Sequence, residues 1–206
     1  MIEILTYDVF YGSCSRLKLS ILIMYLENMV IHRLNDEICF KPIGYVIEGI
    51  PRKGDPRRKL ISSKYDFISR IRVFNEYKDC LAGLDGFSHI IVIWYAHVSI
   101  NKPHLVRPMG RSDMPLVGVF ATRSANRPNP ICISVVELEY IKEEELGVRG
   151  LDAWTGTPLL DIKPYTYYDI IRRPKVSDWF LKYWKEKSSK LNYREKYPLL
   201  GPESIT

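Results

Sequence analysis

Short runs of apolar residues, separated by polar or Gly- and Pro-rich stretches, recur along most of the chain after Cys39. Runs of this length predict β-strands, because amphipathic helices need longer periodic segments. The expected strands cover residues 39–50, 69–74, 89–98, 117–122, 131–141, 146–153 and 158–163. Several strands with few intervening helices favour an antiparallel barrel or sandwich over a βαβ array. We therefore expect an all-β fold, mainly an antiparallel β-barrel.

Two of these segments carry more specific expectations. Residues 89–98 are rich in Ile, Val, Trp and Tyr without alternation, which is typical of a strand buried on both faces. Residues 76–82 predict a short internal helix that ends at Gly83.

The C-terminal segment predicts an amphipathic helix. Apolar residues recur there at i, i+3, i+4, i+7 and i+8, namely Val176, Trp179, Phe180, Tyr183 and Trp184. Three lysines fall outside this aromatic stripe: Lys182, Lys185 and Lys187. The stripe either packs on the barrel or across a dimer, or stacks on RNA bases while the lysines meet phosphates.

We divide the chain into an extension (residues 1–37), a barrel domain (38–170) and a helical tail (171–206). The apolar run at residues 19–26 is too short to cross a bilayer, which takes about 20 residues. We therefore expect no membrane segment and a cytoplasmic protein. Met24 and Met29 are alternative start sites, so the extension is either lineage-specific or a misassigned start, which an intact mass would decide.

A polar loop between the expected strands 117–122 and 131–141 is the strongest candidate for a binding site. It holds two arginines and two amides: Arg123, Asn126, Arg127 and Asn129. Pro128 and Pro130 restrict their own φ and favour extended geometry in the residues before them, so the loop is stiff. A stiff loop of this kind can fix donors and acceptors around a polar ligand, although a surface turn explains the same residues.

The order of residues in this loop, ATRSxxRPNPI, resembles the central motif of the TrmO family (TsaA-like, VirR-like). Further segments fit the family in the same order: Pro42-Ile43-Gly44, residues 84–90 (LDGFSHI), Leu151-Asp152 and residues 156–165 (GTPLLDIKPY). Several motifs of this length in one order are more specific than a lone glycine pattern. The resemblance covers residues 40–168.

The resemblance implies methyl transfer from S-adenosylmethionine to threonylcarbamoyladenosine in tRNA, beside the anticodon. It also implies a β-barrel methyltransferase that works as a homodimer, with its cofactor near the subunit interface. The chain lacks a G-x-G-x-x-G or P-loop turn, so the cofactor must be held in another way.

The family's motifs also imply which residues bind. The residues that match the family's cofactor-binding positions are Pro56, Arg57, Arg58, His97, Val98, Arg123, Ile133, Thr155, Gly156, Thr157 and Pro158. Modified-base contacts fall on Asn126, Arg127 and Asn129. At three positions the chain departs from the usual residue, because Arg58 and Val98 replace glutamines and Thr155 replaces an aspartate.

Several of these residues can instead have a purely structural role. Arg123 can brace the loop in an ion pair, and Ile133 can be simple core. Asp161 and Lys163 lie two residues apart on an expected strand and so share a face. They either contribute to the cofactor site or form an ion pair with no role in catalysis, and the sequence favours neither. The residues identify no general base, although the acceptor nitrogen must lose a proton.

Charge and cysteine spacing add weaker constraints. The formal net charge is +6, which permits a nucleic-acid partner. The four cysteines are widely spaced and share no ligand spacing with the four histidines, so we expect free thiols and no metal. Two functions stay open: a tRNA methyltransferase that uses S-adenosylmethionine, or a non-catalytic β-barrel that binds RNA or a small ligand.

Overall fold

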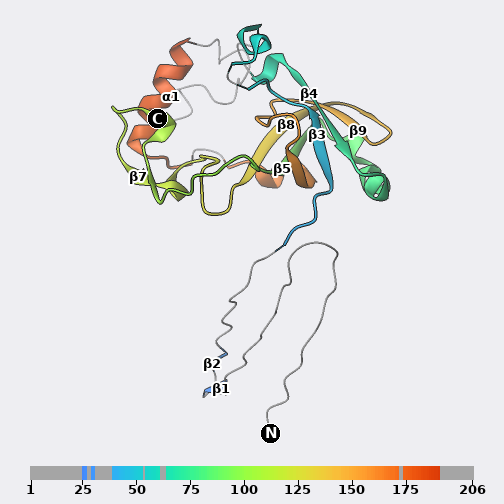
Figure 1. Cartoon of the computed structure of the whole chain (residues 1–206), viewed down its shortest axis with the longest axis horizontal. Coiled ribbons are helices and arrows are strands. Elements are labelled where there is room, and N and C mark those ends of the chain that lie inside the picture. The colour runs from blue at the N-terminus through green and yellow to red at the C-terminus, as the bar shows by residue number, and fades with distance from the viewer. Residues whose placement is uncertain are drawn as a thin grey trace. The chain divides into compact units, whose positions relative to one another are not determined.

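The computed structural model describes residues 39–52, 54–60, 64–171 and 174–190, together with residues 25–26 and 29–30 (Figure 1). The chain divides into two compact units, Met1–Lys41 and Pro42–Thr206. In the first unit, β1 (Tyr25–Leu26) pairs antiparallel with β2 (Met29–Val30). The rest of the expected extension, including Met24, lies outside the described residues.

Six strands of the second unit form a closed antiparallel barrel in the order β10-β3-β4-β9-β8-β5. The barrel strands are β3 (Gly44–Glu48), β4 (Ile68–Val73), β5 (His89–Tyr95), β8 (Ile131–Lys142), β9 (Glu145–Arg149) and β10 (Pro158–Pro164). A separate two-stranded sheet pairs β6 (Leu105–Val106) with β7 (Val117–Gly118). The all-β prediction is confirmed, and of the two architectures that the sequence allowed the chain adopts the barrel.

The helical elements are short except for the last. Six 3-10 helices precede or separate the strands: η1 (Pro56–Leu60), η2 (Lys64–Asp66), η3 (Asn75–Leu81), η4 (Leu84–Gly86), η5 (Pro108–Gly110) and η6 (Val119–Ala121). A seventh, η7 (Tyr167–Asp169), follows β10, and the α-helix α1 (Asp178–Lys190) follows it. No helix among the described residues has the length and apolar character needed to traverse a bilayer.

The interior of the barrel is filled by alternate residues of each strand. Ile71, Ile90, Leu146 and Leu159 are fully buried there. Trp94 also points inward, and its indole Nε1 donates a hydrogen bond of 3.1 Å to Ser134 Oγ. Because successive side chains of a strand point to opposite faces, these positions share the inner face.

The expectation that residues 89–98 form a strand buried on both faces is wrong. In β5, burial alternates: Ile90, Val92 and Trp94 are buried, whereas Ile91 and Ile93 are only partly covered. The hydropathy pattern failed to show this alternation because the outward residues of β5 are apolar too.

Further boundaries differ from the sequence-based expectation. The strand expected at 39–50 covers only Gly44–Glu48, and the strand expected at 89–98 ends at Tyr95. The strand expected at 117–122 ends at Gly118, because Thr122 folds back and its N–H and Oγ1 both donate to the Val119 carbonyl. The strand β9 ends at Arg149 because Gly150 has φ +94°, a left-handed conformation that breaks a strand. The predicted helix at 76–82 exists as the 3-10 helix η3, and Gly83 with φ +79° follows its end.

The amphipathic tail helix is confirmed, although it begins at Asp178, after Val176. Trp179, Phe180, Tyr183 and Trp184 are half-buried, whereas Lys182 and Lys185 are exposed. Aromatic contacts join the stripe along the helix, with the rings of Phe180 and Trp184 stacked at 6.3 Å between centroids.

Candidate functional site

The register of the barrel brings the candidate segments to one end of it. One row of paired residues runs across four strands, from Gly44 through Leu159 and Trp94 to Cys132. Beyond this row on one side lie the end of β5, the start of β8 and the start of β10, because neighbouring strands are antiparallel. Turns that are far apart in sequence therefore meet there.

The turn after β5 and the polar loop before β8 are bonded to each other. The Ala96 N–H donates to the Pro130 carbonyl at 2.8 Å. Ser99 Oγ lies 2.7 Å from Asn126 Oδ1 and 3.1 Å from the Ala125 carbonyl, and it donates to these acceptors. His97 and Val98, which lie between these anchors, are exposed. The structure thus brings both predicted segments together, and Ser99, which sequence reasoning missed, joins them.

Arg123 lies on the surface beside the outer face of β8. Its Nη2 donates to the Ile133 carbonyl at 2.9 Å, which fixes the side chain, while the guanidinium stays exposed. Ile133 itself is 50% exposed and points away from the core. A charged donor and an apolar side chain therefore lie next to each other, as a ligand with a carboxylate and an aromatic ring requires.

The second group of candidates is the turn that leads into β10. The Thr155 hydroxyl accepts from the Gly49 N–H at 3.1 Å, and the Gly156 N–H donates to the Val46 carbonyl at 2.7 Å. Gly156 has φ +83°, which favours glycine. Thr157 is buried and Pro158 begins β10. The threonine that replaces the family's aspartate thus braces the turn against residue 49.

The triplet Pro56, Arg57 and Arg58 lies in η1, after the turn at Gly54. The Arg57 guanidinium forms an ion pair with Asp55 at 2.9 Å, and this contact lowers the pKa of the Asp55 carboxyl below its ordinary value. No bond from Pro56 or Arg57 to the other candidate segments occurs among the described contacts, and the side chain of Arg58 lies outside the described part of the structure, so the cofactor role of the triplet stays a prediction.

Charges from the polar loop and from the residue before the turn at residues 153–158 both act on Cys132. Burial raises the pKa of its thiol, the charges of Arg127 and Arg123 oppose that rise, and the charge of Asp152 adds to it. Asp152 is exposed and precedes the turn at residues 153–158. Sequence reasoning noted Asp152 in a family motif and gave it no role, because its distance in sequence from Cys132 hid the electrostatic effect of its charge on that thiol.

The residues assigned to the cofactor and to the modified base do not line the hollow beside η3 and η4. That hollow has a volume of about 320 Å³ and lies against η3, η4 and the far part of β10, where Tyr77, Leu81, Phe87 and Asp161 line it. The candidate site is instead an exposed surface. Asp161 also forms an ion pair of 2.6 Å with Lys163, which confirms the pairing that the sequence suggested.

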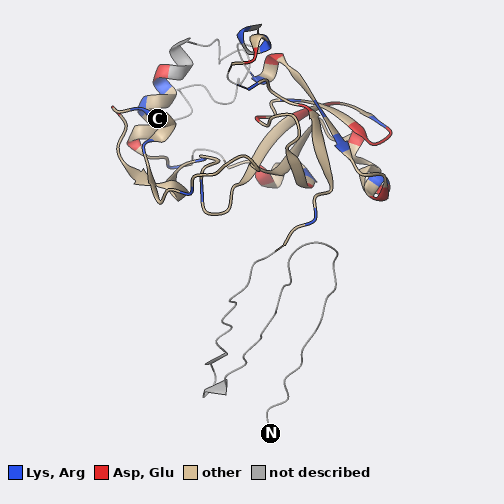
Figure 2. Ribbon diagram, viewed as in Figure 1, with Lys and Arg blue, Asp and Glu red and all other residues tan. Residues whose placement is uncertain are grey.

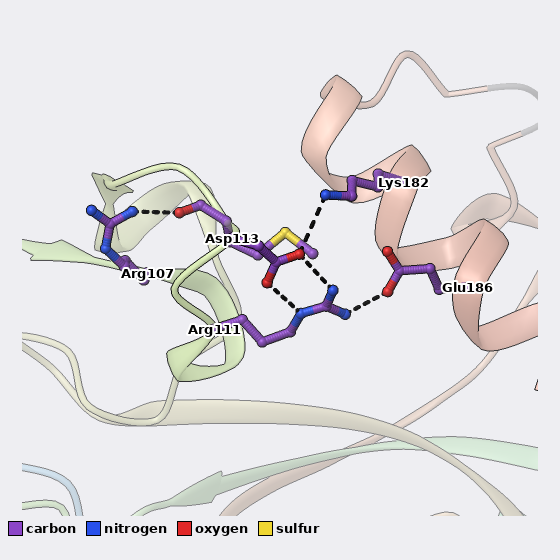
Figure 3. A network of polar contacts seen from close by, with 6 residues as sticks. Arg107, Arg111, Asp113, Lys182 and Glu186 are labelled. Carbon is purple, nitrogen blue, oxygen red and sulfur yellow. Dashed lines mark hydrogen bonds and ion pairs between the residues drawn. The ribbon is translucent and has the colours of Figure 1, made fainter.

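A network of charged side chains joins the loop before β7 to the helix α1 (Figure 3). Arg111 donates to both oxygens of Asp113, at 2.9 Å and 2.7 Å, and to Glu186 on α1 at 2.6 Å. Lys182, also on α1, lies 3.3 Å from Asp113. Arg107 donates to the Met114 carbonyl at 2.6 Å within the same loop. The helix is thereby held against the segment that leads into the polar loop.

We expect the substitution Arg111→Gln to loosen α1 from this loop. Arg111 lowers the pKa of both Asp113 and Glu186 below their ordinary values of 3.8 and 4.5. A lowered folded-state pKa stabilises the attachment above those ordinary values, and the stabilisation is lost as pH falls through the folded-state values. The protection factors of the α1 amides, which correct hydrogen exchange for its own pH dependence, should therefore fall in the variant at neutral pH and, in the wild type, on acidification.

The matched control for this experiment is Lys163→Gln, which removes an exposed ion pair on β10 without touching the helix. It should leave exchange in α1 unchanged. Equal exchange in α1 of the wild type and Arg111→Gln would contradict the assignment.

The segment that contains the polar loop carries more basic than acidic residues, and Figure 2 colours the Lys and Arg positions blue and the Asp and Glu positions red along the ribbon. Residues 96–130 contain five basic side chains, Lys102, Arg107, Arg111, Arg123 and Arg127, against the single acidic residue Asp113. Asp113 is itself paired with Arg111 and Lys182. No group of three or more potential metal ligands occurs within the described part of the chain.

The model of the tRNA-methyltransferase O N-terminal domain matches residues 48–170. The chain is 38% identical over 152 residues to a probable S-adenosyl-L-methionine-binding protein of Pyrococcus abyssi, covering 73% of this chain and 78% of the relative. It is 38% identical over 130 residues to the tRNA (adenine(37)-N6)-methyltransferase of Mus musculus, covering 61% of this chain and 30% of that enzyme.

Solved structures agree with these relatives. The crystal structure of TrmO from Pseudomonas aeruginosa superposes with a TM-score of 0.53 at 30% identity, covering 68% of this chain and 61% of that one. The chain thus spans about three fifths of that solved structure and less than a third of the mouse enzyme.

Proposed function

The chain belongs to the tRNA-methyltransferase O N-terminal domain family, and from this premise we propose that it is a tRNA methyltransferase that uses S-adenosylmethionine. The acceptor in this proposal is the exocyclic nitrogen of threonylcarbamoyladenosine beside the anticodon, and the protein works in the cytoplasm. The observation that supports it most directly is the meeting of Arg123, Asn126 and His97 at one barrel end, in a segment with more basic than acidic residues.

The residues at this end fit S-adenosylmethionine in chemical type. The exposed Arg123 guanidinium suits its carboxylate, and the exposed Ile133 side chain suits one face of its adenine. The Asp152 carboxylate, which lies within electrostatic reach of the same thiol as Arg123, suits its ammonium group. When bound, S-adenosylmethionine supplies an activated methyl group whose leaving group is a neutral thioether.

The task of this chain's own residues is therefore mainly to bind and orient. Asn126, Arg127 and Asn129 lie on the same loop as Arg123, and we assign them to the modified base, with Arg127 paired to its threonyl carboxylate. Holding the acceptor in line for transfer lowers the entropic part of the barrier. The acceptor nitrogen must also lose a proton, and we assign no residue to that step.

The proposal is tested by two measurements on the full chain. Calorimetric titration should show binding of S-adenosylmethionine, and labelled methyl should pass to tRNA that carries the threonylcarbamoyl group and not to tRNA without it. Binding of tRNA without methyl transfer would favour the non-catalytic barrel that the substitutions at Arg58, Val98 and Thr155 left open. The relatives named as methyltransferases favour the enzyme.

We also propose that the protein is a homodimer that associates through the outer face of β5 and β8. Ile133 and Val135 are 50% and 40% exposed there, and they pair with Ile93 and Ile91 of β5. A contiguous strip of aliphatic side chains on the outside of a barrel is typical of an interface. This placement would set the Ile133 region of two copies close together.

The substitution Val135→Asp should convert a dimer into a monomer, because it buries an unpaired charge in the interface. Sedimentation velocity measures the change, and an unchanged circular dichroism spectrum shows that the barrel persists. Lys142→Asp, on the same strand outside the strip, is the control that should remain dimeric. A wild-type protein that sediments as a monomer at all concentrations would refute the proposal.

A further inference from the structure

Phe120 is an exposed aromatic residue directly before the polar loop. Its side chain is 76% exposed, whereas the preceding residue, Val119, is only 3% exposed. Single exposed apolar side chains are common on protein surfaces, so the exposure of Phe120 matters only together with the fixed turn that carries it and the arginine beside it. Phe120 therefore differs from the aromatic stripe of α1, whose rings are already half-buried.

The turn that carries Phe120 is held on both sides. The Val119 N–H donates to the His104 carbonyl at 2.8 Å. Thr122 closes the turn, since its N–H donates to the Val119 carbonyl at 3.0 Å and its Oγ1 donates to the same oxygen at 2.8 Å. With Val119 anchored in the interior, the backbone fixes Phe120 so that its ring projects outward. The ring is thus exposed because the hydrogen bonds of the turn fix its position.

The neighbours of the ring favour an anionic, aromatic partner. The Arg127 guanidinium lies 5.8 Å from the centroid of the ring, in a cation–π contact, and its Nη1 lies 3.5 Å from the Thr122 carbonyl. Asn126 and Asn129 on the following loop are exposed donors and acceptors. The segment is basic, and its one carboxylate, Asp113, is engaged by Arg111 and Lys182.

We propose that Phe120 is a stacking platform for an unpaired base of tRNA, with Arg127 beside it to meet the same nucleotide. This proposal rests on the proposed function, in which tRNA is the substrate. It places the tRNA next to the loop that carries Arg123. Unpaired bases are recognised by stacking on aromatic rings next to arginines, whatever the base. A second copy of this chain is a poorer partner for Phe120, because the ring lies beside the Arg127 guanidinium, which suits a nucleotide better than an apolar protein surface.

The experiment compares Phe120→Ala and Phe120→Tyr with the wild type, using a tRNA anticodon stem–loop that carries 2-aminopurine at one unpaired position. Phe120→Ala should weaken binding of this RNA by about tenfold, since one stacked base contributes that much on average. Phe120→Tyr keeps a ring of the same shape and should restore the affinity. The 2-aminopurine emission should be quenched by the wild type and by Phe120→Tyr, and less by Phe120→Ala.

The control variant is Tyr168→Ala, which removes an aromatic side chain that is 98% exposed elsewhere on the unit. It should leave both RNA affinity and 2-aminopurine emission unchanged. Unchanged RNA affinity in Phe120→Ala would overturn the proposal, as would conversion of a dimer into a monomer by that substitution. Phe120→Ala should still bind S-adenosylmethionine as the wild type does. Failure of the wild type to bind S-adenosylmethionine and to methylate tRNA would instead refute the proposed function.

Discussion

Replacing Arg123 with alanine should weaken binding of S-adenosylmethionine by about 10- to 100-fold, the range expected when one hydrogen-bonded charged partner is lost. Arg123 is exposed, yet its position is fixed by the bond from its Nη2 to the Ile133 carbonyl. If Arg123 binds the cofactor, its other guanidinium nitrogens can do so without the entropic cost of ordering a free side chain. Isothermal titration calorimetry measures the affinity, and the methyl-transfer rate should fall in parallel.

Two further variants separate binding from structure. Arg123→Lys keeps the charge and loses the planar fork of donors, so its affinity should lie between those of the wild type and Arg123→Ala. Arg70→Ala removes an arginine on the outside of β4 that pairs with Glu48 at 2.8 Å, and it should leave the affinity unchanged. If Arg123→Ala binds S-adenosylmethionine as tightly as the wild type, the arginine only braces its loop.

Gly44→Ala should lower the free energy of unfolding by about 3 kcal/mol, at the upper end of the usual cost of overpacking. A Cβ at this position would lie 2.0 Å from the Arg72 carbonyl oxygen and 2.9 Å from Val73 Cα. Both are backbone atoms of the neighbouring strand β4, which cannot move away without breaking the β3–β4 pairing. Urea denaturation, followed by circular dichroism, measures the loss.

Gly86→Ala is the control that separates the effect of the clash with β4 from the general effect of replacing glycine with alanine. A Cβ at Gly86 would meet no atom within 4 Å, and Gly86 is not among the glycines with positive φ. That substitution should leave the free energy of unfolding almost unchanged or raise it slightly, because alanine has less freedom than glycine in the unfolded chain. Equal stability of the two variants would show that β3 and β4 can separate locally.

Gly44 also shows what a sequence can and cannot reveal about a glycine. Its place in the motif Pro42-Ile43-Gly44 marked it as part of a family signature. The reason for glycine there is the carbonyl of Arg72, which is distant in sequence and adjacent only after the barrel has closed.

Local patterns were sufficient to locate the six barrel strands and the family motifs, but not to place every strand end. The strand at residues 131–141 was predicted because apolar and β-branched residues dominate it, and the structure places β8 at Ile131–Lys142. The polar loop was identified because proline restricts the backbone within a few residues, which needs no tertiary information. The tail helix followed from a 3.6-residue period for the same reason.

What the sequence determined by itself was thus local: the strand segments, the stiff Arg- and Asn-bearing loop, the amphipathic helix and the order of family motifs. The tertiary structure alone decided that residues 89–95 bury one face and expose another apolar one, that Ser99 bonds to Asn126, and that Arg111 ties the loop to α1. These features depend on which strands and helices become neighbours, and that choice is made by closure of the barrel, whose pairings join residues far apart in the chain.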